Sequence, residues 1–393
     1  MRKSLENRNQ PGNDPELTGR ERRALIAMSG GVDSSVAAFL MKEAGFECVG
    51  CTMKLYDGDA SGNLQNETGS ASGNLRSCCT LSDTEDAGAV ARRLGMPFYV
   101  FNFKDAFREQ IIGRFICSYE NGETPNPCID CNRYMKFGKL FDRAEILDCD
   151  SIVTGHYARI EEAGDGSGRL VLKKALDPSK DQSYVLYSLT QEQLRHIHFP
   201  LGSLHKDEVR RIAAAQGFVN ADKPDSQDIC FVPDGDYARV IEAYTGRKAA
   251  PGNYVDPAGN VLGTHQGITH YTIGQRKGLG IAFGSPRYVC AIRKESNEVV
   301  LGTNEELFHR EVLIGEVNWI AGEPPAESFS CSAKIRYRQA EQPAMGRVLA
   351  DGRVQLVFDE PQRAITPGQA AVLYDGDLVL GGGRICTGGL SLQ

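Results

Sequence analysis

Three cysteines and one glycine-rich turn are the residues of this chain whose types and spacing could do chemistry. Cys128 and Cys131 stand three positions apart in ETPNPCIDCNR (123–133), and Cys230 lies in PDSQDICFV (224–232). The turn is AMSGGVDSS (27–35), which combines two glycines, three hydroxyls and a carboxylate. These types suit thiol chemistry at the cysteines and anion binding at the turn.

The turn at 27–35 predicts a phosphate site. Gly30 and Gly31 let the backbone turn tightly, and the helix that follows adds its N-terminal dipole. The pattern is neither G-x-x-x-x-G-K-[ST] nor G-x-G-x-x-G. The alternative is a glycine-rich strand-to-helix turn with capping serines and no ligand.

Three hypotheses fit the C-x-x-C pair. A zinc site needs four ligands, and neither Cys78-Cys79 nor the seven histidines offer a second pair at suitable spacing. A redox pair of the thioredoxin type would follow the first strand of its fold, which this pair does not. The third hypothesis is a nucleophilic thiol. Cys131 is expected to open a helix, whose N-terminus lowers thiol pKa values. Cys230 is its candidate distant partner, or else a buried strand cysteine.

Length, composition and charge limit the classes of protein to which the chain can belong. The chain has 393 residues, 12 cysteines and a net charge of −7. The N-terminus lacks the apolar core of a signal peptide, and no stretch approaches the ~20 apolar residues of a membrane span. We expect a cytoplasmic protein without membrane contact, with a disordered tail over residues 1–22. The net charge argues weakly against nucleic acid, so any such binding needs local basic runs such as KIRYR (334–338).

The elements that must position these residues alternate in the first half of the chain. Alternating strands and helices predict an α/β, doubly wound parallel sheet over residues 23–236, interrupted by a mobile Gly/Ser/Asn insertion at 57–77. Strands are expected at 24–28, 46–56, 98–103 and 151–160, and helices at 32–45 and 82–95.

The second half is different. Residues 237–305 predict a small mixed central domain. Residues 306–393 contain short apolar runs separated by Asp351-Gly352 and Asp375-Gly376, which are hairpin signals. They predict a C-terminal antiparallel β-barrel.

Nine motifs in order along residues 27–374 resemble a known family. They are SGGVDSS, CTMK, TPNPCxxCNRxxKFG, TGHYAR, KDQSYVLY, PDSQDICF, YTIGQRKGLGI, KIRYRQ and TPGQAAVLY. Together they are similar to the tRNA-specific 2-thiouridylases, and S-G-G-x-D-S resembles the PP-loop of ATP pyrophosphatases. The resemblance implies an enzyme with a PP-loop domain, a central domain and a β-barrel that contacts tRNA.

The resemblance also implies roles for single residues. Cys131 matches the nucleophile and Cys230 the persulfide carrier, which form a transient disulfide with each other, so Cys128 would not be a redox partner. No resident metal ligand is implied. Residues that match ATP-binding positions are Ala27, Met28, Ser29, Gly30, Gly31, Val32, Asp33, Ser34, Met53 and Gly155. Residues that match tRNA-contact positions are His156, Lys180, Asp181, Gln182, Arg336, Tyr337 and Gln369.

The implied reaction uses ATP with Mg²⁺ to adenylate the C2 oxygen of the wobble uridine. Sulfur then replaces this oxygen. The sulfur is either released from the Cys230 persulfide by Cys131 or delivered by the persulfide directly. The implied partners are tRNA and a persulfide donor or carrier, such as a cysteine desulfurase relay. Many relatives have Asp at position 128, and that Asp is proposed to act as an acid or base near the target base. In this chain Cys128 occupies the position, so the resemblance does not assign the acid–base role to residue 128.

Two rival functions remain. One is another PP-loop enzyme that adenylates its substrate, either a synthetase that captures it with an amine or another tRNA sulfurtransferase. The other is a zinc-bearing tRNA-binding module without catalysis.

Overall fold

A computed structural model of the chain describes residues 22–56, 80–225, 229–232, 235–281 and 284–387. The expectations for the tail at 1–22 and for the insertion at 57–77 lie almost wholly outside these residues. Among the residues described, no helix is long and apolar enough to cross a membrane.

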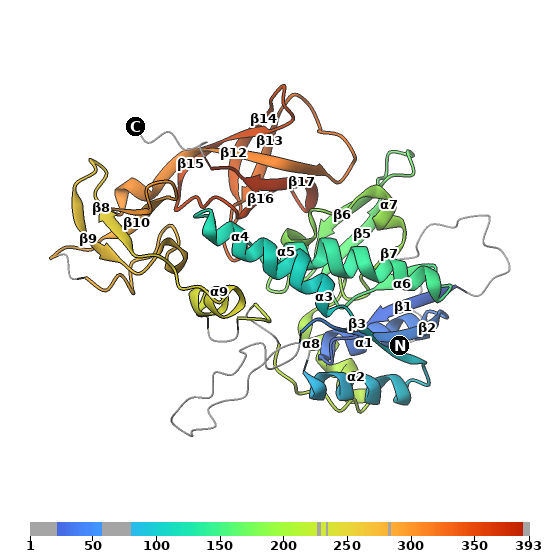
Figure 1. Cartoon of the computed structure of the whole chain (residues 1–393). Helices are drawn as coiled ribbons and strands as arrows, with labels where there is room; N and C mark the ends of the chain where they lie inside the picture. The colour runs from blue at the N-terminus through green and yellow to red at the C-terminus, as the bar shows by residue number, and fades with distance from the viewer. Residues whose placement is uncertain (1–21, 57–79, 226–228, 233–234, 282–283, 388–393) are drawn as a thin grey trace, which may run out of the picture.

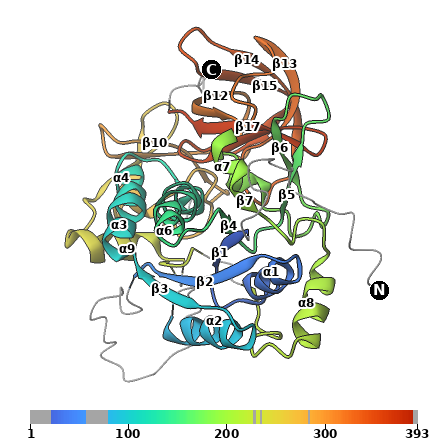
Figure 2. The ribbon, with the colours of Figure 1, turned by 90° about the vertical axis from the view of Figure 1, so that its right-hand side faces the viewer.

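A five-stranded parallel sheet forms the first part, with strand order β3-β2-β1-β4-β7. Helices cover both of its faces, with α1, α2 and α8 on one side and the longer helical run from α3 to α6 on the other (Figure 1, Figure 2). This confirms the predicted doubly wound class. The strands are β1 (Arg23–Ala27), β2 (Glu47–Lys54), β3 (Phe98–Asn102), β4 (Ser151–Val153) and β7 (Ile197–His198).

The helices of this part differ in regularity. A helical run from residue 127 to 146 contains π-type turns and a non-helical residue, Phe137 (φ −112°, ψ 19°). The helices are α1 (Val32–Glu43), α2 (Leu81–Arg93), α3 (Lys104–Phe107), η3 (Arg108–Gly113), α4 (Arg114–Glu120), α5 (Pro127–Asp130), η4 (Cys131–Lys139), α6 (Leu140–Ile146), η5 (Ser183–Leu186), α7 (Gln191–Arg195) and α8 (Lys206–Ala215).

The central part is a small four-stranded sheet with order β10-β11-β8-β9, preceded by one helix. It contains α9 (Tyr237–Thr245), β8 (Gly252–Val255), β9 (Val261–His265), η6 (Ile268–His270), β10 (Tyr288–Arg293), β11 (Glu298–Gly302) and η7 (Glu305–Leu307).

Six antiparallel strands close into a barrel through the pairing of β12 with β17, as predicted. Both Asp-Gly turns lie between consecutive strands, with Gly352 and Gly376 at positive φ. The strands are β12 (Phe308–Trp319), β13 (Ser328–Lys334), β14 (Gln342–Val348), β15 (Val354–Arg363), β16 (Ala370–Asp375) and β17 (Leu378–Ile385).

The predicted single strand at 151–160 is wrong. It is two strands, β4 and β5 (Ala158–Glu162), which belong to different sheets. β5 forms a hairpin with β6 (Leu170–Lys174), and β6 pairs with β17 of the barrel. The first part of the chain therefore contributes two strands to the barrel sheet.

Candidate active site

The phosphate loop follows β1 at the carboxyl edge of the parallel sheet. Gly30 has φ +73°, and a Cβ there would collide with the backbone of Asp83 in α2. Gly31 is the N-cap of α1. A side chain at position 30 is therefore excluded both by backbone conformation and by the close approach of α2.

Serine hydroxyls brace this loop. Ser34 Oγ accepts from the Ser29 amide at 3.2 Å and donates to the Gly31 carbonyl at 3.1 Å. Ser35 Oγ donates to the same carbonyl at 3.0 Å. The hydroxyls fix the turn, and the N-terminus of α1 supplies the N–H groups and the positive dipole end that favour an anion.

The carboxylate of Asp33, in the first turn of α1, accepts hydrogen bonds from two side chains. Tyr157 OH donates to Oδ1 at 2.7 Å, and Lys206 Nζ lies 2.7 and 2.8 Å from the two carboxylate oxygens. Burial, followed by the charge of Asp33, raises the pKa of Tyr157, so this phenol stays protonated and donates.

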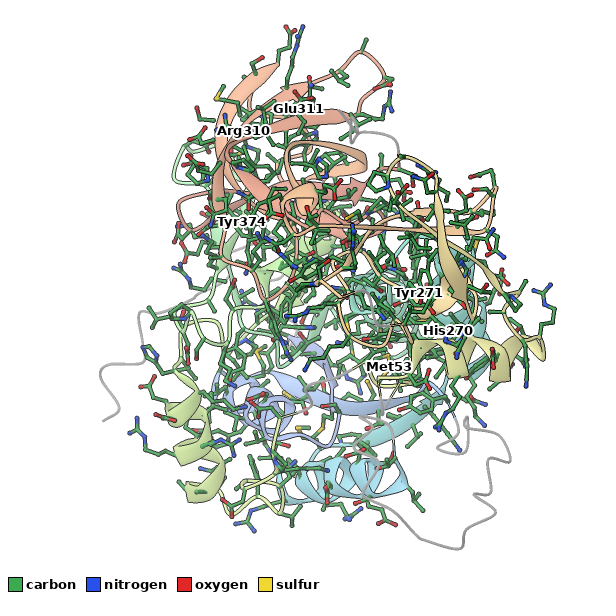
Figure 3. All side chains as sticks on the ribbon, turned by 90° about the vertical axis from the view of Figure 1, so that its left-hand side faces the viewer. Met53, His270, Tyr271, Arg310, Glu311 and Tyr374 are labelled. Carbon is green, nitrogen blue, oxygen red and sulfur yellow. The ribbon has the colours of Figure 1, made fainter. Side chains whose placement is uncertain are left out.

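Met53 and Gly155 lie at the same edge of the sheet. Met53 is next to the last residue of β2 and packs against the large hydrophobic cluster that the first part shares with the barrel (Figure 3). Gly155 follows β4, and a Cβ there would lie 2.7 Å from the Ser34 amide nitrogen. The ends of three neighbouring strands thus surround the phosphate loop, which is where ligands bind in open parallel sheets.

The cysteine pair lies at the start of the helical run. The expectation that Cys131 opens the helix is wrong, because the helix begins at Pro127 with Asn126 as its N-cap. Asn126 Oδ1 accepts from the Cys128 amide at 3.1 Å. Cys128 is exposed, and Cys131 is half-buried one turn further along.

Cys230 packs on the same hydrophobic cluster as Cys131. Its carbonyl accepts from Tyr56 OH at 2.7 Å. The next residue, Phe231, is buried and meets Phe107 and Phe115 edge-to-face at centroid distances of 5.8 and 5.1 Å. The fold therefore brings two cysteines 99 positions apart in sequence onto one cluster, and Cys230 is half-buried.

The barrel holds the segment that leads to the cysteine pair. Gln369 Nε2 donates to the Thr124 carbonyl at 2.8 Å and to the Pro125 carbonyl at 3.3 Å. Arg384 of β17 pairs with Glu123. The predicted contact residue Gln369 thus has a role inside the protein.

Tyr337 is exposed, and its ring lies 5.8 Å from that of Tyr184. Partial burial of its phenol raises the pKa of Tyr337. Tyr374 of β16, labelled in Figure 3, is fully buried.

His156 is buried, which was not expected of a surface contact. Its Nδ1 lies 2.7 Å from Thr154 Oγ1, and its Nε2 lies 3.4 Å from Lys136 Nζ. Because an ammonium can only donate, Nε2 accepts and Nδ1 carries the proton. Burial, followed by the charge of Lys136, lowers the pKa of His156 well below its usual value.

The side chains of residues 180–182 make polar contacts with other residues of the protein. Lys180 Nζ lies 2.9 Å from Asp225 Oδ2. The Asp181 carboxylate accepts from Ser183 and from the Ala175 amide, and Gln182 Oε1 accepts from the Tyr157 amide at 3.0 Å.

Arg336 points into the protein. One guanidinium nitrogen donates to the carbonyls of Ile273 and Ala364 and to Thr366 Oγ1, at 3.1, 3.0 and 2.6 Å. Burial lowers its pKa. Arg336 thus joins the central part to the barrel.

Four residues of this site were not singled out from the sequence: Tyr157, Lys206, Asn220 and Asp225. Asn220 Nδ2 donates to the Gly30 carbonyl and to Ser35 Oγ, both at 2.9 Å. All four reach the loop or its partners from distant parts of the chain, and no local spacing marks them. Within the described ranges, no group of three or more His, Cys, Asp or Glu residues could hold a metal ion.

Comparisons with known proteins cover nearly the whole chain. Three family models match in succession: a tRNA methyl transferase HUP domain at 22–234, a tRNA methyl transferase PRC-barrel domain at 239–303 and an aminomethyltransferase beta-barrel domain at 309–385.

Curated relatives are named tRNA-specific 2-thiouridylase MnmA. The protein from Clostridioides difficile is 47% identical over 93% of this chain and 98% of its own length. A relative from Thermoanaerobacter sp. is 49% identical over 93% and 98%. Among solved structures, the U34-tRNA thiolase NcsA from Methanococcus maripaludis matches with a TM-score of 0.33 and 16% identity, over 60% of this chain and 74% of that one. A TM-score of this size supports no argument about this chain.

Proposed function

We propose, from the premise that this chain belongs to the tRNA-specific 2-thiouridylase family, that it is an enzyme that uses ATP to thiolate a uridine of tRNA. The observation that carries the proposal is the family membership over 93% of the chain, together with a phosphate loop and two distant cysteines on one domain. The amine-capturing synthetase requires no thiols, and a zinc-bearing module requires a set of ligands that the described residues do not bring together. The wobble uridine is the proposed target.

ATP is the proposed co-substrate, split between its α- and β-phosphates. The loop at 27–34 would bind the phosphates through N–H groups at the start of α1, and Met53 and Gly155 would border the nucleotide. The C2 oxygen of uridine is a poor leaving group, and adenylation would turn it into the oxygen of AMP.

Mg²⁺ is proposed to accompany ATP. Asp33 fits this ion because Mg²⁺ is usually held by one or two carboxylates together with substrate phosphates. The bound ion would neutralise phosphate charge. Lys206 and Tyr157 would keep the Asp33 carboxylate oriented.

Cys230 and Cys131 are the proposed sulfur-transfer pair. A donor or carrier protein would leave a persulfide on Cys230. The Cys131 thiolate would attack Cys230 Sγ, forming a Cys131–Cys230 disulfide and releasing hydrosulfide. Hydrosulfide would attack C2 of the adenylated uridine, with AMP as the leaving group. An external thiol would then reduce the disulfide.

The proposed tRNA contacts are Tyr337, which is exposed, and the segments around Lys180 and Gln369, which are bonded to Asp225 and to the residues before the cysteine pair. His156 and Arg336 are bonded within the protein and would support these contacts. The hydrogen bonds from Gln369 to the Thr124 and Pro125 carbonyls support a binding surface that includes the barrel.

Mass spectrometry of tRNA nucleosides tests the function. Incubation with tRNA, ATP, Mg²⁺ and a persulfide donor should give 2-thiouridine with AMP and pyrophosphate in equal amounts. ADP and phosphate as the products, or a Cys131→Ser protein that still forms 2-thiouridine, would contradict the proposal.

A further inference from the structure

Asn220 is a buried amide that holds the phosphate loop from a distant part of the chain. It is 2% exposed and lies 190 positions after Gly30. Its Nδ2 donates to the Gly30 carbonyl and to Ser35 Oγ, both at 2.9 Å. Within the described ranges, its Oδ1 is buried and has no hydrogen-bond partner. Asn220 therefore acts on the loop through its donor nitrogen.

The two acceptors fix the orientation of this amide. A carbonyl oxygen can only accept, so the NH₂ end of the side chain must face Gly30. Ser35 Oγ donates to the Gly31 carbonyl at 3.0 Å, so it accepts from Asn220. An amide turned the other way would place its oxygen against the Gly30 oxygen and leave both without a hydrogen.

The segment that carries Asn220 is itself anchored on both sides. Phe218 is buried and packs in the hydrophobic cluster that contains the buried residues of α1. Lys223 Nζ lies 2.7 Å from Asp83 Oδ1 and 2.6 Å from Asp86 Oδ2, both in α2. Because α1 and α2 flank the loop and hold this segment, the amide is a fixed point against which the Gly30 carbonyl is oriented.

The peptide between Gly30 and Gly31 is the one that this hydrogen bond orients. In a planar trans peptide, the C=O and the N–H point in opposite directions. Asn220 holds the Gly30 C=O, so the Gly31 N–H points away from Asn220. Among the described residues this N–H has no hydrogen-bond partner, and Gly31 is the N-cap of α1. The N–H is therefore available to an anion at the start of that helix.

We propose that Asn220 is a positioning residue for ATP, which holds the Gly30 carbonyl so that the Gly31 N–H is directed at the phosphate groups. This role rests on the proposed function of the loop at 27–34 as the ATP site. Asn220 acts through the loop and does not bind the phosphates. It favours binding because the loop has the required orientation before the anion arrives. Without the Nδ2 donor the peptide can turn, and the phosphates lose a charge-assisted hydrogen bond.

The experiment measures AMP formation at varied ATP and at varied tRNA, which gives kcat and a KM for each substrate. The proteins are the wild type, Asn220→Ala and Asn220→Asp. Asn318→Ala and Asn318→Asp are the matched controls, because Asn318 Nδ2 also donates to two carbonyls, those of Tyr187 and Leu189, at 2.8 and 2.9 Å, but from β12 of the barrel. Both pairs of variants remove the same kind of donor.

Asn220→Ala should raise the KM for ATP about tenfold or more, because a hydrogen bond to a charged group is lost, and should leave the KM for tRNA unchanged. Asn220→Asp should raise the KM for ATP further, since a carboxylate repels both the Gly30 carbonyl oxygen and the phosphates. The Asn318 variants should keep the wild-type KM for ATP. A role of Asn220 in stability alone would lower the amount of active enzyme, and hence the apparent kcat, without changing either KM.

Hydrogen–deuterium exchange of the wild type tests the same contact without a substitution. A bound non-hydrolysable ATP analogue should slow the exchange of the Gly31 N–H, located by fragmentation of the peptide that contains it. If Asn220→Ala does not fold, Asn220→Asp, which has nearly the same shape as Asn, carries the kinetic test.

An unchanged KM for ATP in the Asn220 variants would overturn the proposal, as would a bound analogue that leaves the exchange of the Gly31 N–H unchanged. A rise in the KM for ATP that the Asn318 variants share equally would also overturn it. A wild type that binds no analogue contradicts the proposed function of the loop, and the role of Asn220 with it.

Discussion

Gly155→Ala tests the close approach between the end of β4 and the phosphate loop. The added Cβ would lie 2.7 Å from the Ser34 amide nitrogen and 2.9 Å from the Asp33 carbonyl carbon. These are backbone atoms, which cannot rotate away, so the loop and the end of β4 must separate by about 0.7 Å to restore normal van der Waals contact. Overpacking of this kind costs about 1–3 kcal/mol.

The cost should be visible both in stability and in ATP use. The melting temperature should fall by roughly 2–4 °C per kcal/mol for a domain of this size. A displacement approaching 1 Å should lower kcat/KM for ATP, measured as AMP formation, on the order of 10–100-fold.

The matched control is Gly164→Ala. Gly164 lies between β5 and β6, and a Cβ there has nothing within 4 Å. The control should resemble the wild type in both assays. If Gly155→Ala and Gly164→Ala give the same melting temperature and the same kcat/KM, the close approach at position 155 does not constrain the loop and the argument fails.

Cys131→Ser and Cys230→Ser should each abolish 2-thiouridine formation, measured by nucleoside mass spectrometry, while AMP formation stays detectable. Cys128→Ser should keep most of the activity, and complete inactivity would make the C-x-x-C a functional pair. Arg336→Ala should lower the free energy of unfolding in urea by about 2–3 kcal/mol, because the substitution removes a charged donor from three hydrogen-bond acceptors. A variant that loses tRNA affinity at unchanged stability would contradict this. The pKa of His156 is lower in the folded protein than in the unfolded chain, so the unfolded chain binds more protons below pH 6.5. As pH falls below 6.5, the wild type should therefore lose about 1.4 kcal/mol of stability per pH unit more than His156→Gln; parallel curves would refute this.

Features built from adjacent residues were predictable from the sequence. The phosphate loop is a strand, two glycines and a helix start within ten residues, and the structure has that order at 23–32. The Asp-Gly turns of the barrel are equally local. In each case the backbone conformation depends on residues that are neighbours in the chain.

The start of the helix at the cysteine pair has a local signal in the sequence. Asn126-Pro127 is a common helix start, with Asn as N-cap and Pro in the first turn. The expected start at Cys131 is four residues beyond the observed start at Pro127. The consequence is that Cys128, and not Cys131, is closer to the helix N-terminus.

Other features depend on distant segments and could not be inferred from local patterns. The run SIVTGHYARI alternates like one strand, but it leaves the parallel sheet after Val153 and joins the barrel sheet at Ala158. Periodicity does not say which sheet a strand joins. Lys206 likewise lies 173 positions from Asp33, and its sequence context resembles an ordinary helix start.

The hairpin β5–β6 has a consequence for the synthesis of the protein. Its partner strand, β17, begins at Leu378, whereas β6 ends at Lys174. At typical translation rates of about 5–20 residues per second, β6 waits roughly 10–40 s after its own synthesis for that partner. During this interval its outer edge is a template for pairing with other chains. A chain released early never receives β17, nor the Gln369 and Arg384 contacts that hold the segment before Cys131. Truncated translation products should therefore be both prone to aggregate and unable to position the thiol, so incomplete copies of the enzyme should not act on tRNA.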